Sequence, residues 1–311
     1  MARPHGVGKD LNERMSVRDF LILALVCVVW ASNNIVSKFV VGPLDVPPLF
    51  YAACRFLVVA VAVSPWLLPA PRPLWRLIVI ALLMGGGNFA FVFLGLQTAT
   101  PSGVAVVSQL GVPITTLLSV VMLGERIHWR RGIGIALTFA GAILVMFDPH
   151  RFSISLGLTY TLMSAALSSL GAVMMKQMEG VKPLQFQAWV GFASLWPLAL
   201  LSLVFEPGQL QAGLHAGWPF IAAVLFSGLV VSVTGHTFYY WLIQRYEANL
   251  ISPLTLMTPL ATIALGVAIT HDPFGPRMAL GSAVALAGVL IIALRRNQVA
   301  PLLLAIRNRA Q

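Results

Sequence analysis

The sequence has few charged residues for its length of 311 residues. Charged side chains make up 10% of the chain, against about 25% in soluble domains, whereas 58% of the residues are hydrophobic. A chain of this composition cannot cover its surface with polar groups. Its apolar residues come in blocks of about 20, the length that crosses a bilayer. The composition therefore predicts an integral membrane protein.

Catalytic and metal-binding motifs are also missing. The sequence contains no HExxH, GxSxG or P-loop motif and no Cys/His spacing typical of a metal site. Its two cysteines, Cys27 and Cys54, both fall inside apolar blocks, so we interpret them as packing residues rather than a disulfide or a metal pair. We therefore expect neither an enzyme nor an ATP-driven pump, and we expect no cofactor and no metal.

No Asp or Glu falls deep inside an apolar block. The carboxylates near the blocks lie at their ends, at Asp19, Glu125, Glu179, Glu206 and Glu247. Proton-coupled carriers usually use a carboxylate inside the membrane. Coupling would then depend on His236, or transport would be uncoupled, and the sequence leaves both alternatives open.

The apolar blocks predict ten transmembrane helices. Polar, Pro and Gly breaks place them near residues 19–40, 48–68, 76–97, 102–123, 132–147, 155–175, 185–205, 218–242, 249–270 and 278–294. The longest internal loop is predicted at 205–217. The N-terminal stretch carries no cleavage site after a short apolar core, so we expect the first helix to be retained.

Basic residues lie mostly on one side of the predicted helices. Sixteen of the 20 lysines and arginines fall on the side of the N-terminus, and only Arg151 and Arg277 fall on the other. Positively charged loops stay in the cytoplasm, so both termini should be cytoplasmic. The charge of +10 then reflects orientation rather than nucleic-acid binding.

The two halves of the chain resemble each other at an offset of about 146 residues. Pro113 matches Pro259, and the pair Gly134 and Gly141 matches Gly281 and Gly288. Five helices per half force the second copy to enter the membrane from the opposite side, as in many carriers. The alternative is chance similarity between Leu/Ala/Gly-rich helices. The expected segments are 1–17 as a tail, 18–147 and 151–294 as five-helix repeats, and 295–311 as a basic tail.

Prolines and glycines inside the helices are candidate bending points. Pro113 and Pro259 each remove a backbone donor, which gives either a static kink or a bend that lines a central cavity. Gly86 lies in a run of three glycines and is interpreted as a hinge or as a wall that leaves room for a substrate. The pairs Gly134/Gly141 and Gly281/Gly288 are expected to allow close helix packing.

Polar and aromatic residues inside the helices are candidates for a substrate site. They would converge if the first, third, fourth, eighth and ninth helices surround a pore. The alternative is hydrogen bonding between helices, worth about 0.6–2 kcal/mol per contact. The candidate substrate-binding residues are Trp30, Asn33, Asn34, Lys38, Asn88, Ser108, Gln109, His236, Tyr239, Tyr240, Thr255 and Thr258.

Lys38 and Arg55 are the two cations that fall inside predicted helices. Both are expected toward the outer ends of their helices. There they would either snorkel to the interface or pair with Asp45 or Glu206. The alternative is a funnel at the outer mouth that attracts carboxylates.

Several short motifs make the chain similar to a known family. They are Trp30-Ala31-Ser32-Asn33, Arg55-Phe56, and Leu123-Gly124-Glu125-Arg126 followed by Gly132 and Gly141. With them the chain resembles the EamA-type exporters of the drug/metabolite transporter superfamily, and among these the YddG-like amino-acid exporters, over residues 16–296. The second half departs from this pattern. The segment that corresponds to the Leu-Gly-Glu-Arg loop reads Ile269-Thr270-His271-Asp272-Pro273, so its acidic residue, Asp272, is displaced.

The resemblance implies an all-α membrane protein of two inverted five-helix repeats around a central cavity. It implies a secondary exporter in the bacterial inner membrane that works by alternating access, with aromatic and other neutral amino acids as substrates. The expected partners are this small molecule and the lipid bilayer, without nucleic acid, and the chain is expected to be a monomer, with a homodimer as the alternative. A broader drug or nucleotide-sugar carrier, a channel and a membrane enzyme are the competing readings.

Overall fold

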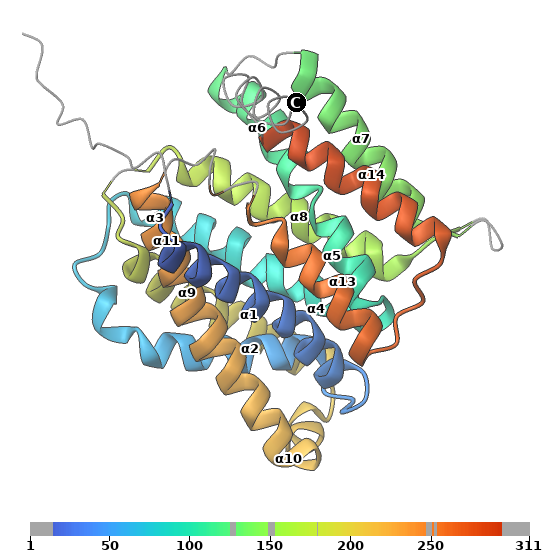
Figure 1. The fold of residues 1–311 in the computed structure, drawn as a ribbon. Coiled ribbons are helices and arrows are strands. Elements are labelled where there is room, and N and C mark those ends of the chain that lie inside the picture. Colours follow the sequence, from blue (N-terminus) through green and yellow to red (C-terminus); the bar gives the residue numbers. More distant parts are fainter. Residues whose placement is uncertain are drawn as a thin grey trace, which may run out of the picture.

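The structure is a computed structural model that describes residues 15–124, 129–148, 153–178, 180–246, 251 and 254–293. In these residues it is a bundle of helices (Figure 1). The first half contains α1 (Val17–Val41), α2 (Pro48–Ala62), η1 (Ser64–Leu67), α3 (Leu74–Ala81), η2 (Leu82–Gly87), α4 (Asn88–Thr98), α5 (Pro101–Ser108), α6 (Gly111–Leu123) and α7 (Trp129–Met146). The second half contains α8 (Leu156–Met175), α9 (Pro183–Phe205), α10 (Gln209–Leu225), η3 (Phe226–Gly235), α11 (His236–Arg245), α13 (Met257–Ile269) and α14 (Pro276–Ala293). Between the halves, the two-residue strands β1 (Phe147–Asp148) and β2 (Ser153–Ile154) pair antiparallel.

The helices are long and apolar. Within the described residues, and with joined segments counted as one, eight are long and apolar enough to cross a membrane. α2 and α13 are shorter apolar helices. Large apolar side chains point outward, with Val121 82% and Leu203 67% exposed, as expected of a surface that lipid covers. These features confirm the prediction of a helical membrane protein.

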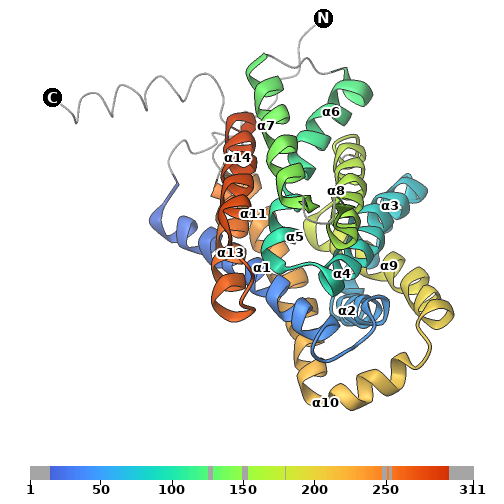
Figure 2. The same cartoon turned by 90° about the vertical axis from the view of Figure 1, so that its right-hand side faces the viewer.

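One prediction about a connection is wrong. The segment 205–217, predicted as the longest internal loop, is already helical from Gln209 as the start of α10. The helix bends sharply at Gly217, where φ is +59°, a conformation that glycine adopts without a clash of a Cβ atom. Pro219 then lies near the start of the continuing helix. The hydropathy pattern shows the polar stretch but not that it is a short helix at the edge of the bundle (Figure 2).

The third predicted helix of each half contains a π-helical segment. In the first half this segment is η2, at the run of glycines, and in the second half it is η3, which runs directly into α11. A π segment widens the helix by one residue per turn and is frequent at functional sites. Hydropathy alone cannot distinguish it from an α-helix, so the sequence does not predict it.

The helices are interrupted one turn before Pro113 and Pro259. α5 ends and α6 begins around Gln109, and a matching turn at Thr255 precedes α13. Proline has no N–H to offer the carbonyl four residues earlier. That carbonyl instead accepts from the amide three residues after it, at 3.1 Å for Gln109 and 3.0 Å for Thr255. Each break therefore satisfies its own backbone groups inside the helix.

The last helices of the two halves, α7 and α14, pack directly against each other (Figures 1 and 2). A Cβ atom on Gly134 would lie 2.8 Å from the carbonyl oxygen of Gly288, and one on Gly281 would lie 3.0 Å from that of Gly141. Real Cβ atoms essentially never show the first distance and seldom show the second, so the small size of glycine permits this approach. The predicted packing role of the four glycines is confirmed.

Two carboxylates hold the N-termini of helices. Asp272 accepts hydrogen bonds from the amide of Ser102 at 2.9 Å and from its hydroxyl at 2.5 Å, at the start of α5. Glu206 accepts from the amides of Leu49 and Phe50, both at 2.8 Å, at the start of α2. The first amides of a helix lack partners and carry partial positive charge. Each acid therefore stabilises a helix end that lies far from it in sequence.

Candidate functional site

An aromatic cluster joins the two halves inside the bundle. Trp30 of α1 lies against His236 and Tyr239 of α11, with ring centroids 5.2 Å and 5.1 Å away. The Nδ1 atom of His236 is 3.1 Å from the carbonyl of Val231. Because a carbonyl only accepts, Nδ1 carries the hydrogen, and the bond fixes the imidazole against the indole. Three predicted site residues therefore do meet.

A chain of hydrogen bonds crosses from α1 to α2 and η3. Ser227 donates to the Oδ1 atom of Asn33 at 2.7 Å, and the Tyr51 hydroxyl lies 2.5 Å from Ser227 and 3.4 Å from Ser37. A hydroxyl has one hydrogen. Since that of Ser227 goes to Asn33, Tyr51 donates to Ser227. The predicted residue Asn33 is thus held in place at the end of a buried chain of donors.

The other two predicted asparagines also bond across helices. The Nδ2 atom of Asn34 donates to Thr262 of α13 at 3.3 Å. Ser164 of α8 donates to Asn88 at 2.5 Å. Each amide keeps further donors or acceptors beyond the bond that it makes here.

Lys38 is bound to backbone carbonyls. It lies in the last turn of α1, and its ammonium donates to the carbonyls of Leu96 at 2.7 Å and Gln97 at 3.3 Å, at the end of α4. Carbonyls at a helix C-terminus carry partial negative charge and favour a cation. The predicted pairing with Asp45 or Glu206 is wrong, because no ion pair among the described residues joins Lys38 to either carboxylate, and Glu206 stabilises the start of α2.

Arg55 differs most from its expected position. It was expected at the outer end of its helix, but it lies midway along α2 and is 0% exposed. Its Nε and Nη2 atoms donate to Ser232 of η3 at 3.1 Å and 2.9 Å. Its Cζ atom lies 4.0 Å from the centroid of Phe89. Both the snorkelling of Arg55 and its pairing with Asp45 or Glu206 are therefore wrong.

The remaining predicted residues lie at the breaks in the helices. Ser108 ends α5, and Gln109 follows it. Thr255 lies in the turn before α13, and Thr258 is the second residue of α13. All four are half-buried. The side chain of Tyr240 lies outside the part of the chain that the structure describes, as do Glu125 and Arg126 of the family-like loop.

Gly86, the predicted hinge, lies in η2 against α9. A Cβ atom on Gly86 would lie 3.4 Å from the Cβ atom of Ser194. One on the preceding Gly85 would lie 2.5 Å from the Oγ atom of the same serine. The glycines thus allow close packing at the π segment, and the predicted hinge motion stays a prediction.

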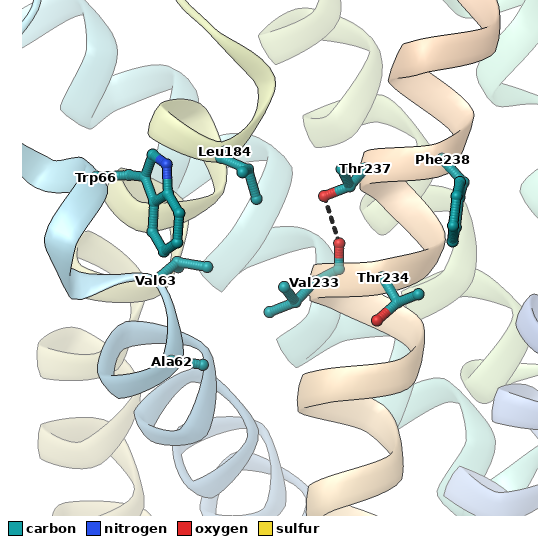
Figure 3. Close-up of a pocket in the computed structure, with 8 residues that line it drawn as sticks. All are labelled: Ala62, Val63, Trp66, Leu184, Val233, Thr234, Thr237 and Phe238. Atoms are coloured by element: carbon teal, nitrogen blue, oxygen red, sulfur yellow. Dashed lines mark hydrogen bonds between the residues drawn. The ribbon is translucent and has the colours of Figure 1, made fainter.

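A pocket of about 350 Å³ opens beside this interior (Figure 3). Figure 3 shows Val63 and Trp66 on one side and Thr234 and Thr237 on the other. It lies between the end of α2, the start of α9 and the η3–α11 helix. Its lining is Ala62, Val63, Trp66, Leu184, Val233, Thr234, Thr237 and Phe238. A neighbouring pocket of about 590 Å³ shares Trp66, Leu184 and Thr237 with it.

Some interior residues were missed by the sequence reasoning. Tyr51, Ser164, Ser227 and Ser232 all bond to residues of other helices. Serines are common in membrane helices, so these gave no distinct signal. Arg55 did give one, since a cation inside an apolar helix is rare and marks function. Together these groups form a polar interior with aromatic walls that suits a small amphiphilic molecule.

The sequence matches the EamA-like transporter family twice, over residues 19–147 and 155–294. Two bacterial relatives bear the name "Probable amino-acid metabolite efflux pump". That of Escherichia coli K12 is 26% identical over 286 residues, covering 89% of this chain and 95% of its own. That of Salmonella typhimurium LT2 is 27% identical over 287 residues, with the same coverage of 89% and 95%.

An archaeal relative and a solved structure extend the comparison. An "Uncharacterized transporter" of Archaeoglobus fulgidus is 24% identical over 286 residues, covering 90% of this chain and 100% of its own. One crystal structure superposes with a TM-score of 0.58 at 19% identity, covering 89% of this chain and 96% of its own. At that identity the likeness shows a shared fold only.

Proposed function

Because the chain belongs to the EamA-like transporter family, we propose that it is a secondary transporter that exports amino acids or similar small metabolites across the bacterial inner membrane. Aromatic and other neutral amino acids are the proposed substrates. The names of the two bacterial relatives support amino acids as substrates. The family and these names indicate a transporter rather than an enzyme.

The observation that carries the proposal is the polar and aromatic interior shared by the two halves. Trp30 meets His236 and Tyr239, and Asn34 meets Thr262, in each case across the halves. Polar groups inside a membrane bundle are costly and gather along transport pathways. A site formed between the halves changes its shape when one half moves relative to the other.

The proposed roles follow from the chemistry of each group. The rings of Trp30, Tyr239 and Tyr240 suit an apolar or aromatic side chain, and amides and hydroxyls suit the amino and carboxylate ends. His236 is the proposed titratable group if export is proton-coupled. The remaining proposed binding residues are Asn33, Asn34, Lys38, Asn88, Ser108, Gln109, Thr255 and Thr258.

We further propose ten spans arranged as two inverted five-helix repeats. Each half matches the same family separately, and each has a π segment and a proline break at corresponding places. A shift of 147 residues turns the contact of Gly134 with Gly288 into that of Gly281 with Gly141. Contacts that exchange in this way are those of a two-fold axis between antiparallel elements, which supports inversion.

Alternating access is the proposed mechanism. The π segments and proline breaks are the places where helices can change register or bend at low cost. Bending there would open and close the interior on either side while the ends held by Glu206 and Asp272 stay fixed. Gly86, Pro113 and Pro259 are the proposed bending points.

Export from whole cells tests the proposal. Bacteria that express the chain are fed a phenylalanine-containing dipeptide, which raises internal phenylalanine, and its release into the medium is followed. Expressing cells should release phenylalanine faster than cells with an empty vector. Equal release of phenylalanine and of other neutral amino acids, with the protein present in the membrane, would contradict the proposal.

A further inference from the structure

Arg55 is a buried guanidinium that is not ion-paired within the part of the chain that the structure describes. It is 0% exposed and lies midway along α2. Among the described residues, the ion pair found within 4 Å joins Arg245 to Asp19, and no carboxylate lies within that distance of Arg55. Charges inside a membrane bundle are costly and normally paired, and an unpaired one marks a functional site.

The neighbours of Arg55 compensate only part of its charge. The Cζ atom of Arg55 lies 4.0 Å from the centroid of the Phe89 ring and 6.0 Å from that of the Phe93 ring. Such cation–π contacts reach about 2 kcal/mol when desolvated. The remaining partner is the neutral hydroxyl of Ser232. The aromatic rings therefore pack against the guanidinium, and none of the contacts among the described residues brings a negative charge to it.

The hydrogen bonds of Arg55 to Ser232 use only one edge of the guanidinium. Ser232 occupies the edge formed by Nε and Nη2. Nη1 is buried and has no hydrogen-bond partner among the described residues. The edge formed by Nη1 and Nη2 carries two parallel N–H bonds, and this is the arrangement that matches the two oxygens of a carboxylate.

A second buried donor, also without a hydrogen-bond partner in the described part of the chain, faces the same turn of η3. It is the indole Nε1 of Trp30, which would lie 3.1 Å from a Cβ atom on Gly235. Gly235 and Ser232 are three residues apart in η3, and His236, on which Trp30 packs, follows directly. The Arg55 guanidinium and the Trp30 indole, each with an N–H that lacks a partner in the described residues, therefore both lie against the same turn of η3.

We propose that Arg55 binds the carboxylate of the transported molecule, with the Trp30 indole N–H as a further donor. The substrates are then small monocarboxylates with an apolar or aromatic side chain, such as neutral α-amino acids. This inference rests on the proposed function and deepens it.

The carboxylate reaches Arg55 when α2 and η3 separate. Gly228 of η3 now packs tightly on α2, since a Cβ atom there would lie 2.7 Å from Val58 and 3.3 Å from the Arg55 carbonyl. The pocket of Figure 3 lies between the same two elements. Its residue Ala62 is seven positions along α2 from Arg55, about 10 Å. Opening this contact joins the pocket to the guanidinium.

Binding to the purified, detergent-solubilised chain tests the inference without any transport step. The probes are L-phenylalanine, L-phenylalaninamide and 3-phenylpropionate, which share a side chain and differ in the carboxylate or the amine. The wild type should bind phenylalanine more tightly than its amide. Arg55→Gln should weaken phenylalanine and 3-phenylpropionate by about 10- to 100-fold, the loss of a charge-assisted pair, and leave the amide nearly unchanged.

Two further variants sharpen the comparison. Arg76→Gln is the matched control, because this arginine bonds to Gln177 away from the interior and its loss should leave all three affinities unchanged. Arg55→Lys keeps the charge without the planar fork and should weaken the carboxylates less than Arg55→Gln does. It also serves if Arg55→Gln fails to elute as a single folded species.

The outcomes separate the inference from the proposed function. A wild type that binds the carboxylates no better than the amide, or an Arg55→Gln variant that keeps the preference, overturns the inference. Transport of phenylalanine by such a protein would leave the proposed function intact. Conversely, Arg55-dependent binding without transport in liposomes would support the carboxylate site and overturn the exporter.

Discussion

Trp30 links the two halves through the aromatic cluster. Its ring contacts two side chains of α11, and its buried N–H has no hydrogen-bond partner among the described residues. An aromatic pair is worth about 0.5–1.5 kcal/mol beyond its buried area. A substrate ring that packs on the indole would gain a similar amount.

Replacing Trp30 should therefore weaken aromatic substrates. Trp30→Ala is expected to raise the KM for phenylalanine by about 3- to 10-fold, measured as uptake into proteoliposomes. Trp196→Ala is the control, because that indole is 62% exposed on the outer surface of α9 and its loss should leave KM unchanged. Equal KM values for the two variants would count against a role of Trp30 at the site.

Asp272 is expected to affect the stability of the fold rather than substrate binding. Asp272→Asn should lower the melting temperature in detergent, because it removes the charge that holds the start of α5. Loss of such a cap costs about 0.5–2 kcal/mol. Asp45→Asn, which changes a carboxylate that no described hydrogen bond or ion pair involves, is the comparison and should change the melting temperature much less. A melting temperature equal to that of the wild type for Asp272→Asn would show that the cap is not needed.

Single residues were predicted unevenly from the sequence. Trp30, His236 and Tyr239 were expected to converge, and they do. For Arg55 the sequence showed a rare charge but not its surroundings, because Ser232 lies 177 residues away along the chain. Contacts of that kind depend on how helices pack, which periodicity and hydropathy do not encode.

Elements were predicted better than residues. The predicted helix at 19–40 corresponds to Val17–Val41, and that at 185–205 to Pro183–Phe205, because the apolar blocks are set by membrane thickness. The helix type within a block was not predictable. η2 and η3 are as apolar as the α-helices around them, and a π turn is decided by packing rather than composition.

The contact between α7 and α14 gives the prediction at this scale. Gly141→Val should reduce the folded fraction in a denaturant titration, since a Cβ atom there would lie 2.5 Å from the Gly281 carbonyl. Overpacking of this kind costs about 1–3 kcal/mol. Gly132→Val is the matched control on the same helix, because a Cβ atom there meets nothing within 4 Å. Similar stability of the two variants would contradict a close α7–α14 contact.

The whole molecule is proposed to lie with both termini in the cytoplasm. The basis is the distribution of basic residues, sixteen of 20 on one side. The orientation then places the connection between α13 and α14 on the periplasmic side and the one between η1 and α3 in the cytoplasm.

Cysteine labelling tests this orientation in a chain whose Cys27 and Cys54 are replaced by alanine. Gly275→Cys, at a position with nothing within 4 Å of a Cβ atom, should react with a membrane-impermeant maleimide in spheroplasts. Ala70→Cys, at an exposed position, should react only after the membrane is permeabilised. The reverse pattern would invert the proposed topology.

The central claim is that the molecule is a carrier of amino acids, and counterflow in proteoliposomes tests it most directly. Liposomes preloaded with unlabelled phenylalanine are placed in a trace of labelled phenylalanine. A carrier predicts saturable uptake with a transient overshoot that disappears without preloading, because each inward step then depends on an outward one. Uptake that never saturates and shows no overshoot would indicate a channel and contradict the account.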